Sequence, residues 1–341
     1  MHLPDGILSL PVVATTSAVA ATGFAFGLYH LRGRSQERTS VLMGMMAAFV
    51  FAAQMVNFPV FPGVSGHLMG GVLASVVLGP WAGSCVMASV LIVQALLFAD
   101  GGLTALGANF LNMGLVGAGI GYAIYAELRR VLGGGVRGTL IAAMLAAWIS
   151  VLISAGTCAA ELACSNPGIA WPRLFGWMTL IHAAIGLGEA LITGLVLRSI
   201  LAVRPDLIPG SLDSGKVPLG AGRFAVAGLG VAMAVALFAA PFAYDAPDGL
   251  ETVTEKVGLA VPGEIEPGSN PDPESSEFAP MPDYQLPIPG VASVRLATAG
   301  AGIVGTLVVC LVGAVMAKAL GRTSGRKLEA STPGEANANG A

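Results

Sequence analysis

Long apolar stretches, separated by short polar or Pro/Gly-rich segments, run through most of the chain. A helix that crosses the hydrocarbon core of a bilayer needs about 17–25 predominantly apolar residues. The pattern predicts nine such helices, at about 7–31, 39–56, 66–79, 82–98, 103–126, 137–158, 173–200, 221–243 and 291–318. The third is short, and its separation from the fourth rests on Gly79-Pro80, because proline disrupts a continuing helix. The apolar pattern alone also permits one long helix from 67 to 98.

The distribution of basic residues decides between these two readings. Lys and Arg favour cytoplasmic loops, and two loops, near 33 and 130, are basic through Arg32, Arg34, Arg38, Arg129, Arg130 and Arg137. The N-terminus then lies outside, and an odd number of helices must lie between 66 and 126. Three helices satisfy this condition. The resulting topology places 14 of the 17 basic residues on the cytoplasmic side, including those of the C-terminal tail; the exceptions are Arg173, Lys256 and Arg295.

Composition agrees with a membrane protein rather than a soluble one. The 341 residues are 55% hydrophobic and only 11% charged, and 47 of them are glycine, a residue common where membrane helices pack closely. The first residues lack a basic region and a small-residue cleavage site, so we expect no removable signal peptide. The sequence predicts an all-α polytopic membrane protein.

Shifts in composition divide the chain into four parts. Residues 1–200 form a body of seven predicted helices, and the Pro/Gly/Ser-rich stretch 201–220 is typical of a linker, here cytoplasmic. Residues 221–320 form a two-helix hairpin whose extracytoplasmic loop, 244–290, holds ten of the twenty acidic residues and is expected to be mostly irregular. The tail 321–341 is expected to be a disordered cytoplasmic segment. Cys158 and Cys164 flank a predicted outer loop, where a disulfide is possible.

Motifs of soluble enzymes are missing from the sequence. It contains no GxxxxGK[ST], GxSxG, HExxH or CxxC pattern, so we expect that the protein does not hydrolyse ATP itself. A non-transport scaffold or an intramembrane enzyme remains an alternative at this point.

The four histidines differ in their surroundings. His30 lies at the cytoplasmic edge and is expected to be an interfacial residue. His182 lies inside a predicted helix with Glu189 on the same face, and the pair is either a packing pair or a direct ligand pair, because ionisable groups inside a membrane usually face a partner. His2 and His67 are both predicted on the outer side.

The first two residues can chelate a metal ion. The amine of Met1, the backbone nitrogen of His2 and its imidazole Nδ1 can close two fused rings around one ion in a nearly planar set. Planar nitrogen donors select Ni²⁺ or Cu²⁺, and His67 is the candidate for the fourth position. The Pro4-Asp5-Gly6 turn can fold the terminus toward the bundle. The alternative is an accidental terminal histidine without a function.

Five sequence segments resemble a known transporter family. The segments MHLPDGILS, QMVNFPVFPGVSGHLMGG, QALLFADGGLTALGANFLNMG and HAAIGLGEALITG look like the M component of cobalt/nickel energy-coupling-factor (ECF) ABC transporters. The later AYDAPDGLETVTEKVGLA, with its PDGLE motif at 247–251, resembles the small PDGLE-type N component.

The resemblance implies a seven-helix substrate-binding subunit in the cell membrane, with the N-terminus outside and the C-terminus inside. It implies a transmembrane coupling subunit and two cytoplasmic ATPases as partners, a divalent transition metal as transported substrate, no permanent cofactor and no nucleic acid. It assigns the metal to Met1, His2 and His67. Asn57 matches a position that holds the site in shape, and we interpret three further matches as structural: Asp100, Asn109 and Asn112.

The expected metal is Ni²⁺, because a planar four-nitrogen site favours nickel and the PDGLE-type component resembles the nickel branch. Uptake of Co²⁺ for cobalamin synthesis is the alternative, since low-spin Co²⁺ also accepts near-planar nitrogen ligands. The acidic loop 244–290 is expected to concentrate the cation at the outer face.

Overall fold

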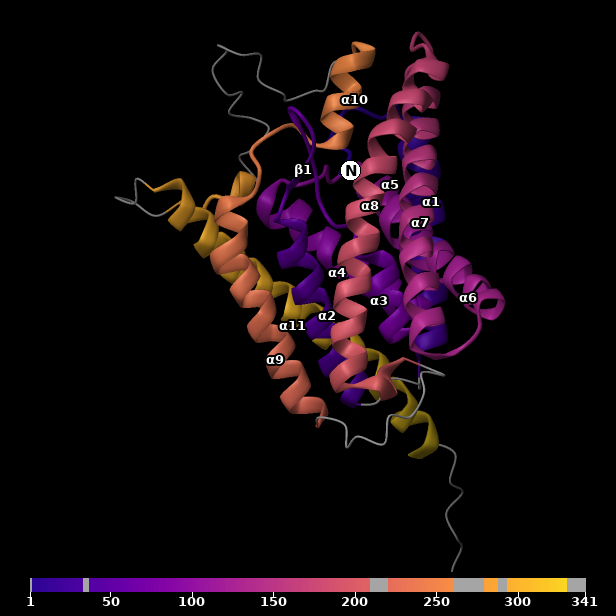
Figure 1. The fold of residues 1–341 in the computed structure, drawn as a ribbon, viewed down its shortest axis with the longest axis vertical. Coiled ribbons are helices and arrows are strands. Elements are labelled where there is room, and N and C mark those ends of the chain that lie inside the picture. The colour runs from indigo at the N-terminus through magenta and orange to yellow at the C-terminus, as the bar shows by residue number, and fades with distance from the viewer. Residues whose placement is uncertain (1, 33–36, 209–219, 260–278, 288–292, 330–341) are drawn as a thin grey trace, which may run out of the picture.

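The computed structural model describes residues 2–32, 37–208, 220–259, 279–287 and 293–329. Its long helices run roughly along one axis and form a bundle, with the N-terminal residues at one end beside the start of α8 (Figure 1). The long helices of this bundle include α1 (Leu10–Leu31), α2 (Glu37–Gln54), α7 (Gly135–Ser165), α8 (Trp171–Val203), α9 (Ala221–Ala234) and α11 (Val294–Glu329).

Among the described residues, six helices are long and apolar enough to cross a membrane, and Thr39–Gln54 is a shorter apolar helix. The expected count of nine is therefore not confirmed. The predicted span 66–79 contains only the eight-residue α3 (Gly71–Leu78), which is too short to cross a bilayer by itself and is almost completely buried in the protein. The predicted break is confirmed, since α3 ends at Leu78 and α4 (Pro80–Val93) begins after Gly79.

The predicted span 103–126 is a composite of three helical pieces. It consists of the short α5 (Leu106–Asn109), a π-helical stretch η2 (Phe110–Ile120) and α6 (Gly121–Leu132). A second π-helical turn, η1 (Gln94–Phe98), ends α4. Such π-helical segments are frequent at functional sites. Here η1 ends just before Asp100 and η2 begins just after Asn109, and these two residues contact the N-terminal segment.

The uncharged segment 57–66 forms a β-hairpin that the apolar pattern did not predict. Strand β1 (Phe58–Phe61) pairs antiparallel with β2 (Val64–Gly66), and Gly63 takes the positive φ of +76° that the turn requires. Pro59 and Pro62 explain the absence of a helix here, because each removes a backbone donor. The hairpin delivers the chain directly to His67.

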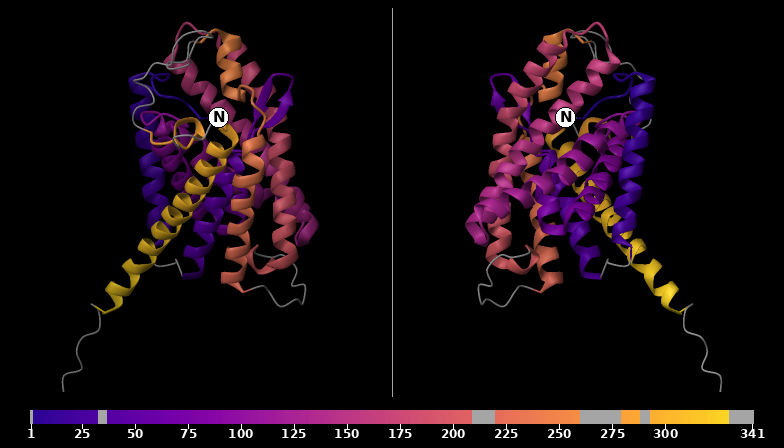
Figure 2. Two further views of the ribbon diagram at one scale, coloured as in Figure 1. Left: turned by 90° about the vertical axis from the view of Figure 1, so that its left-hand side faces the viewer. Right: turned by 90° about the vertical axis from the view of Figure 1, so that its right-hand side faces the viewer.

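The C-terminal hairpin packs against the body along α2. Helices α9 and α11 both lie beside α2, and α11 crosses it at an angle (Figure 2). The contact is close because it uses small residues: a Cβ on Gly44 of α2 would lie 2.6 Å from the carbonyl oxygen of Cys310 in α11. Small residues at such crossings allow membrane helices to approach backbone to backbone.

The structure corrects the expected start of the C-terminal tail and shows one helix inside the acidic loop. The loop 244–290 contains a helix, α10 (Gly249–Val257), and α11 continues to Glu329, beyond the predicted start of a disordered tail. Both Cys158 and Cys164 are free, because they lie on the same helix, α7, and face different environments, one buried and one exposed. Most of the linker (209–219), the middle of the acidic loop (260–278) and the tail from 330 lie outside the described residues.

Candidate metal site

The N-terminal segment is held inside the fold by its own backbone. Leu3 is completely buried, and its N–H donates to Asn109 Oδ1 at 2.8 Å while Asn109 Nδ2 donates to its carbonyl at 3.1 Å. Gly102 N–H donates to the same carbonyl at 2.8 Å. These three bonds fix the residue that follows His2, so the position of His2 is set by the bundle.

Asp5 makes a second attachment of the terminus. Its carboxylate accepts hydrogen bonds from the backbone N–H of Leu103 at 3.0 Å and of Thr104 at 2.7 Å, and also from the Thr104 hydroxyl. Gly6 adopts a φ of +78°, so the Pro4-Asp5-Gly6 turn bends the chain as predicted. A side chain on Gly102 would collide with Asp5, since a Cβ there would lie 2.3 Å from its backbone nitrogen.

The structure brings His2 and His67 together. Their rings stack with centroids 5.2 Å apart and planes 13° from parallel. His67 Nδ1 lies 3.0 Å from the carbonyl of Leu68, so it carries the ring proton and Nε2 keeps its lone pair.

Glu189 holds the loop that carries His67. Its two carboxylate oxygens accept the backbone N–H groups of Met69 at 2.5 Å and Gly70 at 2.9 Å, just before α3. The predicted pairing of His182 with Glu189 is not what organises this region, because each of the two side chains binds a backbone group instead.

Both site histidines are neutral near physiological pH. Burial, together with the positive charge of the amino terminus, lowers the pKa of His2 to about 3 and the pKa of His67 to about 3. Neutral imidazole is the form that binds a metal ion, so neither ring has to lose its charge when an ion arrives.

Asp100 links His2 to the C-terminal part of the chain. Its Oδ1 lies 3.1 Å from His2 Nδ1, and its Oδ2 accepts the hydroxyl of Tyr284 at 2.5 Å. Burial raises the pKa of Asp100. Ala99, the residue before Asp100, and Tyr284 both adopt a positive φ, of 54° and 56°, which is a strained backbone conformation for residues with a side chain.

Gln94 lies behind the His2 ring. Its Nε2 donates to Gln54 Oε1 at 2.9 Å and to the Tyr284 hydroxyl at 3.1 Å, which leaves its Oε1 toward His2. Gln94 Oε1 and His2 Nε2 are both buried and neither has a hydrogen-bond partner of good geometry among the described residues. Two acceptors that face each other cannot pair until one of them carries a proton.

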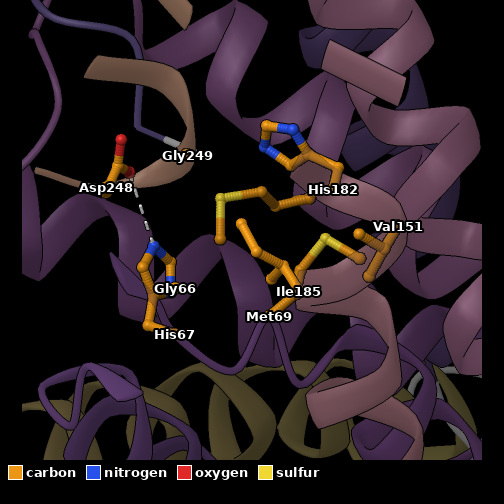
Figure 3. A pocket seen from close by; sticks show the side chains of 9 residues that line it. Gly66, His67, Met69, Val151, His182, Ile185, Asp248 and Gly249 are labelled. Carbon is orange, nitrogen blue, oxygen red and sulfur yellow. Dashed lines mark ion pairs between the residues drawn. The ribbon is translucent and has the colours of Figure 1, made fainter. Parts of the chain in front are cut away.

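The PDGLE segment reaches the site from the other side. Asp248 caps α10: its Oδ1 accepts the N–H of Leu250 at 2.7 Å and of Glu251 at 2.8 Å, and Glu251 Oε2 accepts the N–H of Asp248 at 2.7 Å. Asp248 Oδ2 lies 4.0 Å from His67 Nε2 (Figure 3). Burial would raise the pKa of Asp248, but the positive charge of the amino terminus and His67 outweigh it and hold that pKa well below its usual range.

The segment before α10 is fixed against the β-hairpin. Ser65 N–H donates to the carbonyl of Pro247 at 2.8 Å, and Ser65 Oγ donates to the carbonyl of Ala246 at 2.7 Å. Asn57, which was expected to support the site, contributes its carbonyl, which accepts Tyr244 N–H at 3.0 Å. The hairpin therefore carries His67 and also aligns Asp248 with it.

A small cavity of about 20 Å³ lies beside His67, which is enough for one water molecule. His182, Ile185 and Met69 line it together with Asp248, as Figure 3 shows. His182 Nδ1 lies 2.9 Å from the carbonyl of Met178, one turn earlier on α8, and its Nε2 has no partner among the described residues. His182 also packs on Gly249, where a Cβ would lie 3.2 Å from its ring.

The predicted site residues are thus only partly brought together. His2, His67, Asp100 and Asn109 lie at one place, and Met1 lies outside the described residues. Asn112 is farther inside and donates to Glu161 at 2.8 Å. Among the described residues, no group of three or more His, Cys, Asp or Glu side chains converges to hold an ion.

Sequence reasoning missed Asp248 and Tyr284 as neighbours of the site. The D-x-x-E spacing of Asp248 and Glu251 is a capping signature and predicts the start of a helix. No local sequence pattern predicts that Asp248 lies next to His67, because this contact depends on how the C-terminal hairpin packs on the body.

Two family models match the chain. Residues 2–207 match the family described as the cobalt uptake substrate-specific transmembrane region, and residues 222–322 match the PDGLE domain. A crystal structure of a truncated transition-metal transporter is similar with a TM-score of 0.54 and 28% identity, over 59% of this chain and 99% of that one.

Curated relatives include transport proteins for nickel and for cobalt. The putative fused nickel transport protein NikMN of Archaeoglobus fulgidus is 36% identical over 318 residues, which cover 92% of this chain and 97% of the relative. The fused nickel transport protein NikMN of Rhodobacter capsulatus is 37% identical over 47% of this chain and 46% of its own length. The cobalt transport protein CbiM of Geobacter sulfurreducens is 30% identical over 75% of this chain and 77% of its own length.

Proposed function

Because the chain belongs to the cobalt uptake substrate-specific transmembrane family and carries a PDGLE domain behind that region, we propose that it is the metal-binding subunit of an ECF importer for Ni²⁺. The family and the apolar helices make the chain a multi-pass membrane protein of transition-metal transport.

The observation that carries the proposal is the meeting of His2 with His67. Two imidazoles that share one ion through metal–nitrogen bonds of about 2 Å have their centroids on the order of 4.5–6.5 Å apart. The separation of 5.2 Å between the two rings lies in this range. In our proposal the amine of Met1, the backbone nitrogen and Nδ1 of His2, and Nε2 of His67 bind the ion in one plane.

Binding requires a proton to change places on His2. In the metal-free form Nδ1 faces the Asp100 carboxylate at 3.1 Å and therefore carries the ring proton. When Nδ1 binds the ion, the proton must reside on Nε2, which then donates to the waiting Gln94 Oε1. Such a partner on the far nitrogen fixes the tautomer and orientation of a ligating histidine.

Nickel is favoured over cobalt on two grounds. A planar set of nitrogen donors suits Ni²⁺, and the relatives that share the fused architecture are named as nickel transport proteins. Relatives named as cobalt transport proteins keep Co²⁺ as the alternative substrate.

The remaining steps belong to the assembled transporter. The ion reaches the site from outside the cell membrane, where Asp248 adds a carboxylate next to His67. A transmembrane coupling subunit and two cytoplasmic ATPases then drive a rearrangement that releases the ion inward. This assignment gives the chain no catalytic residue and no permanent cofactor.

The test compares His2→Ala and His67→Ala with His30→Ala as a matched control, because His30 lies at the opposite end of α1, where it hydrogen-bonds to its own helix and stacks on Trp81. Uptake of ⁶³Ni by cells that also express the partner subunits should be lost in the first two variants and kept in the third. Unchanged uptake in both site variants would refute the transport site.

A second test addresses the terminal amine. One extra residue before Met1, or acetylation of its nitrogen, should abolish nickel binding by the purified protein without changing its thermal unfolding. The unmodified protein should form a yellow-orange, diamagnetic nickel complex. Retained binding after acetylation would remove the amine from the proposed ligand set.

A further inference from the structure

A second cavity lies between the end of α6 and the start of α7, far from the metal site. Helix α7 runs along the bundle, and its last residue, Ser165, lies near Ser9 beside the N-terminal segment, so its first residues are at the opposite end (Figure 1). The cavity measures about 300 Å³, which is within the range of small-ligand pockets. It is lined by Tyr122, Tyr125, Ala126, Arg129, Arg130 and Gly134.

The backbone around this cavity is built to receive an anion. Helix α7 has 31 residues, and its N-cap, Gly134, offers no side-chain hydrogen bond, so the first N–H groups of the helix have no side-chain cap. The positive end of the helix dipole adds to these donors. Gly133 and Gly135 adopt φ values of +83° and +88°, which fold the loop tightly over the start of the helix.

Polar side chains at the cavity lack partners. Tyr125 is 3% exposed, and its hydroxyl has no hydrogen-bond partner of good geometry among the described residues. Arg129 Nε and the hydroxyl of the fully buried Thr139, which does not line the cavity, lie next to the Tyr125 hydroxyl and interact with it, but neither has a hydrogen bond of good geometry. Buried polar groups are normally satisfied, and acceptor oxygens of a ligand in the cavity would complete the bonding of Arg129 and Tyr125.

The charges at the cavity favour an anion as that ligand. Arg130 forms an exposed ion pair with Glu127 at 2.8 Å, a kind of pair that contributes little. Arg129 forms no ion pair with a carboxylate in the described part of the chain, so its charge is available. Arginine and backbone N–H groups together are a typical phosphate-binding combination.

Apolar residues around the cavity indicate where the phosphate comes from. Val131, Leu132 and Val136 are exposed large side chains on either side of the glycine loop. In a membrane protein such residues contact acyl chains, and tyrosines are enriched at the level of the lipid headgroups. Inorganic phosphate has no apolar part that could contact these three side chains, whereas a phospholipid does.

We propose that the cavity between α6 and α7 binds the phosphate of an anionic phospholipid. Arg129 and Arg130 face the phosphate, Tyr125 and the first N–H groups of α7 donate to its oxygens, and Val131, Leu132 and Val136 contact its acyl chains. This site is separate from the metal site and does not depend on which metal is transported.

Native mass spectrometry of the full-length protein in a mild detergent tests the proposal. Phosphatidylglycerol should bind about tenfold more tightly than phosphatidylcholine with the same acyl chains, since both carry the phosphate but Arg129 and Arg130 repel the cationic choline group of the second lipid. Arg129→Gln and Tyr125→Phe should each weaken phosphatidylglycerol binding, by about tenfold and about threefold. Arg198→Gln is the matched control, because Arg198 is an exposed arginine of α8 that does not line the cavity.

Thermal unfolding of each variant shows that the fold is kept, and Tyr125→Phe removes only one oxygen if Arg129→Gln proves unstable. Equal binding of the two lipids, or equal loss in Arg129→Gln and Arg198→Gln, would overturn the proposal. Displacement of the lipid by an equal concentration of inorganic phosphate would overturn the lipid as the occupant and assign the cavity to free phosphate.

Discussion

His2 has two ring nitrogens with different neighbours, and the proposed mode of metal binding requires a proton to move from one nitrogen to the other. If Gln94 receives that proton, Gln94→Leu should weaken nickel binding by about 10–100-fold, the usual cost of losing a partner behind a ligating histidine. Isothermal titration of the purified protein measures this change.

Ser89→Ala is the control for that substitution, because Ser89 is buried on the preceding helix and bonds only to the carbonyl of Cys85. It should bind nickel like the unmodified protein. Equal affinities of Gln94→Leu and Ser89→Ala would show that the two unpaired atoms play no part in holding His2.

The pH dependence of nickel binding follows from the pKa values of the two imidazoles. Both are lowered to about 3, so the rings stay neutral when the pH falls through about 6.5, where free histidine titrates. Competition by protons near neutral pH then comes from the amine, whose ordinary pKa is about 7.7–8.0. As the pH falls below that value, the affinity for nickel should decrease about tenfold per pH unit. The decrease should be about a hundredfold per pH unit if the backbone nitrogen of His2 also loses its proton on binding.

The free energy of unfolding of the metal-free protein should also decrease as the pH falls. Unfolded histidines bind protons below about pH 6.5 and the folded ones do not, so the free energy of unfolding should decrease as the pH falls from there toward 3. Unfolding experiments at several pH values measure this decrease. Titrations of nickel affinity at the same pH values measure how steeply the affinity depends on pH. A further steepening centred near pH 6.5 would contradict neutral imidazoles.

At this scale the sequence singled out His2 and His67, whose rings the structure stacks on each other. Their role as metal ligands, together with the amine of Met1, stays a prediction. Tyr284 could not be found in the same way, because its contact with Asp100 joins residues that lie far apart in the sequence. Nothing in its neighbourhood announces which carboxylate it meets.

At the scale of single elements, the start of helix α10 both stabilises this helix and contacts the candidate site. Asp248 uses one oxygen to cap the helix and turns the other toward His67. Asp248→Asn keeps the capping ability and removes the charge, whereas Asp248→Ala removes both and should cost about 1 kcal/mol of stability. We expect both variants to slow the association of nickel, and only the alanine variant to lower the unfolding temperature.

Glu255→Gln, an exposed change on the same helix, is the control for charge alone. Stopped-flow measurement of nickel binding separates association from dissociation. An association rate in Asp248→Asn that equals that of Glu255→Gln would mean that Asp248 only caps the helix.

The elements themselves were predictable where a strong local signal existed. Gly79-Pro80 ends one helix and begins the next, as expected from proline chemistry. The hairpin at 57–66 was missed because its apolar residues resemble a connection between membrane helices, and α3 was overextended because a buried eight-residue helix has the same composition as a span. Apolar composition reports burial in lipid and burial in protein alike.

At the scale of the whole molecule, the docking of the C-terminal hairpin was beyond the sequence. Gly44 on α2 and Gly313 on α11 approach each other closely, since a Cβ on Gly313 would lie 3.3 Å from the Cα of Gly44. Glycines are frequent throughout this chain, so their composition does not identify which two helices meet. Asp248 lies next to His67, and Tyr284 contacts Asp100, which lies next to His2, so the C-terminal part of the chain reaches both histidines.

Deletion of residues 221–341 tests how far the body depends on that hairpin. The proposed ligands all belong to the first 67 residues, and the similar truncated transporter matches only 59% of this chain, so we expect the shortened protein to fold and to bind nickel at equilibrium. Uptake of ⁶³Ni should nevertheless fall strongly, because the carboxylate beside His67 and the phenol that orients Asp100 are gone. Deletion of 330–341 alone is the control and should change neither quantity. Complete loss of binding in the shortened protein would place essential ligands in the PDGLE domain, and unchanged uptake would show that the contacts of Asp248 and Tyr284 have no role in transport.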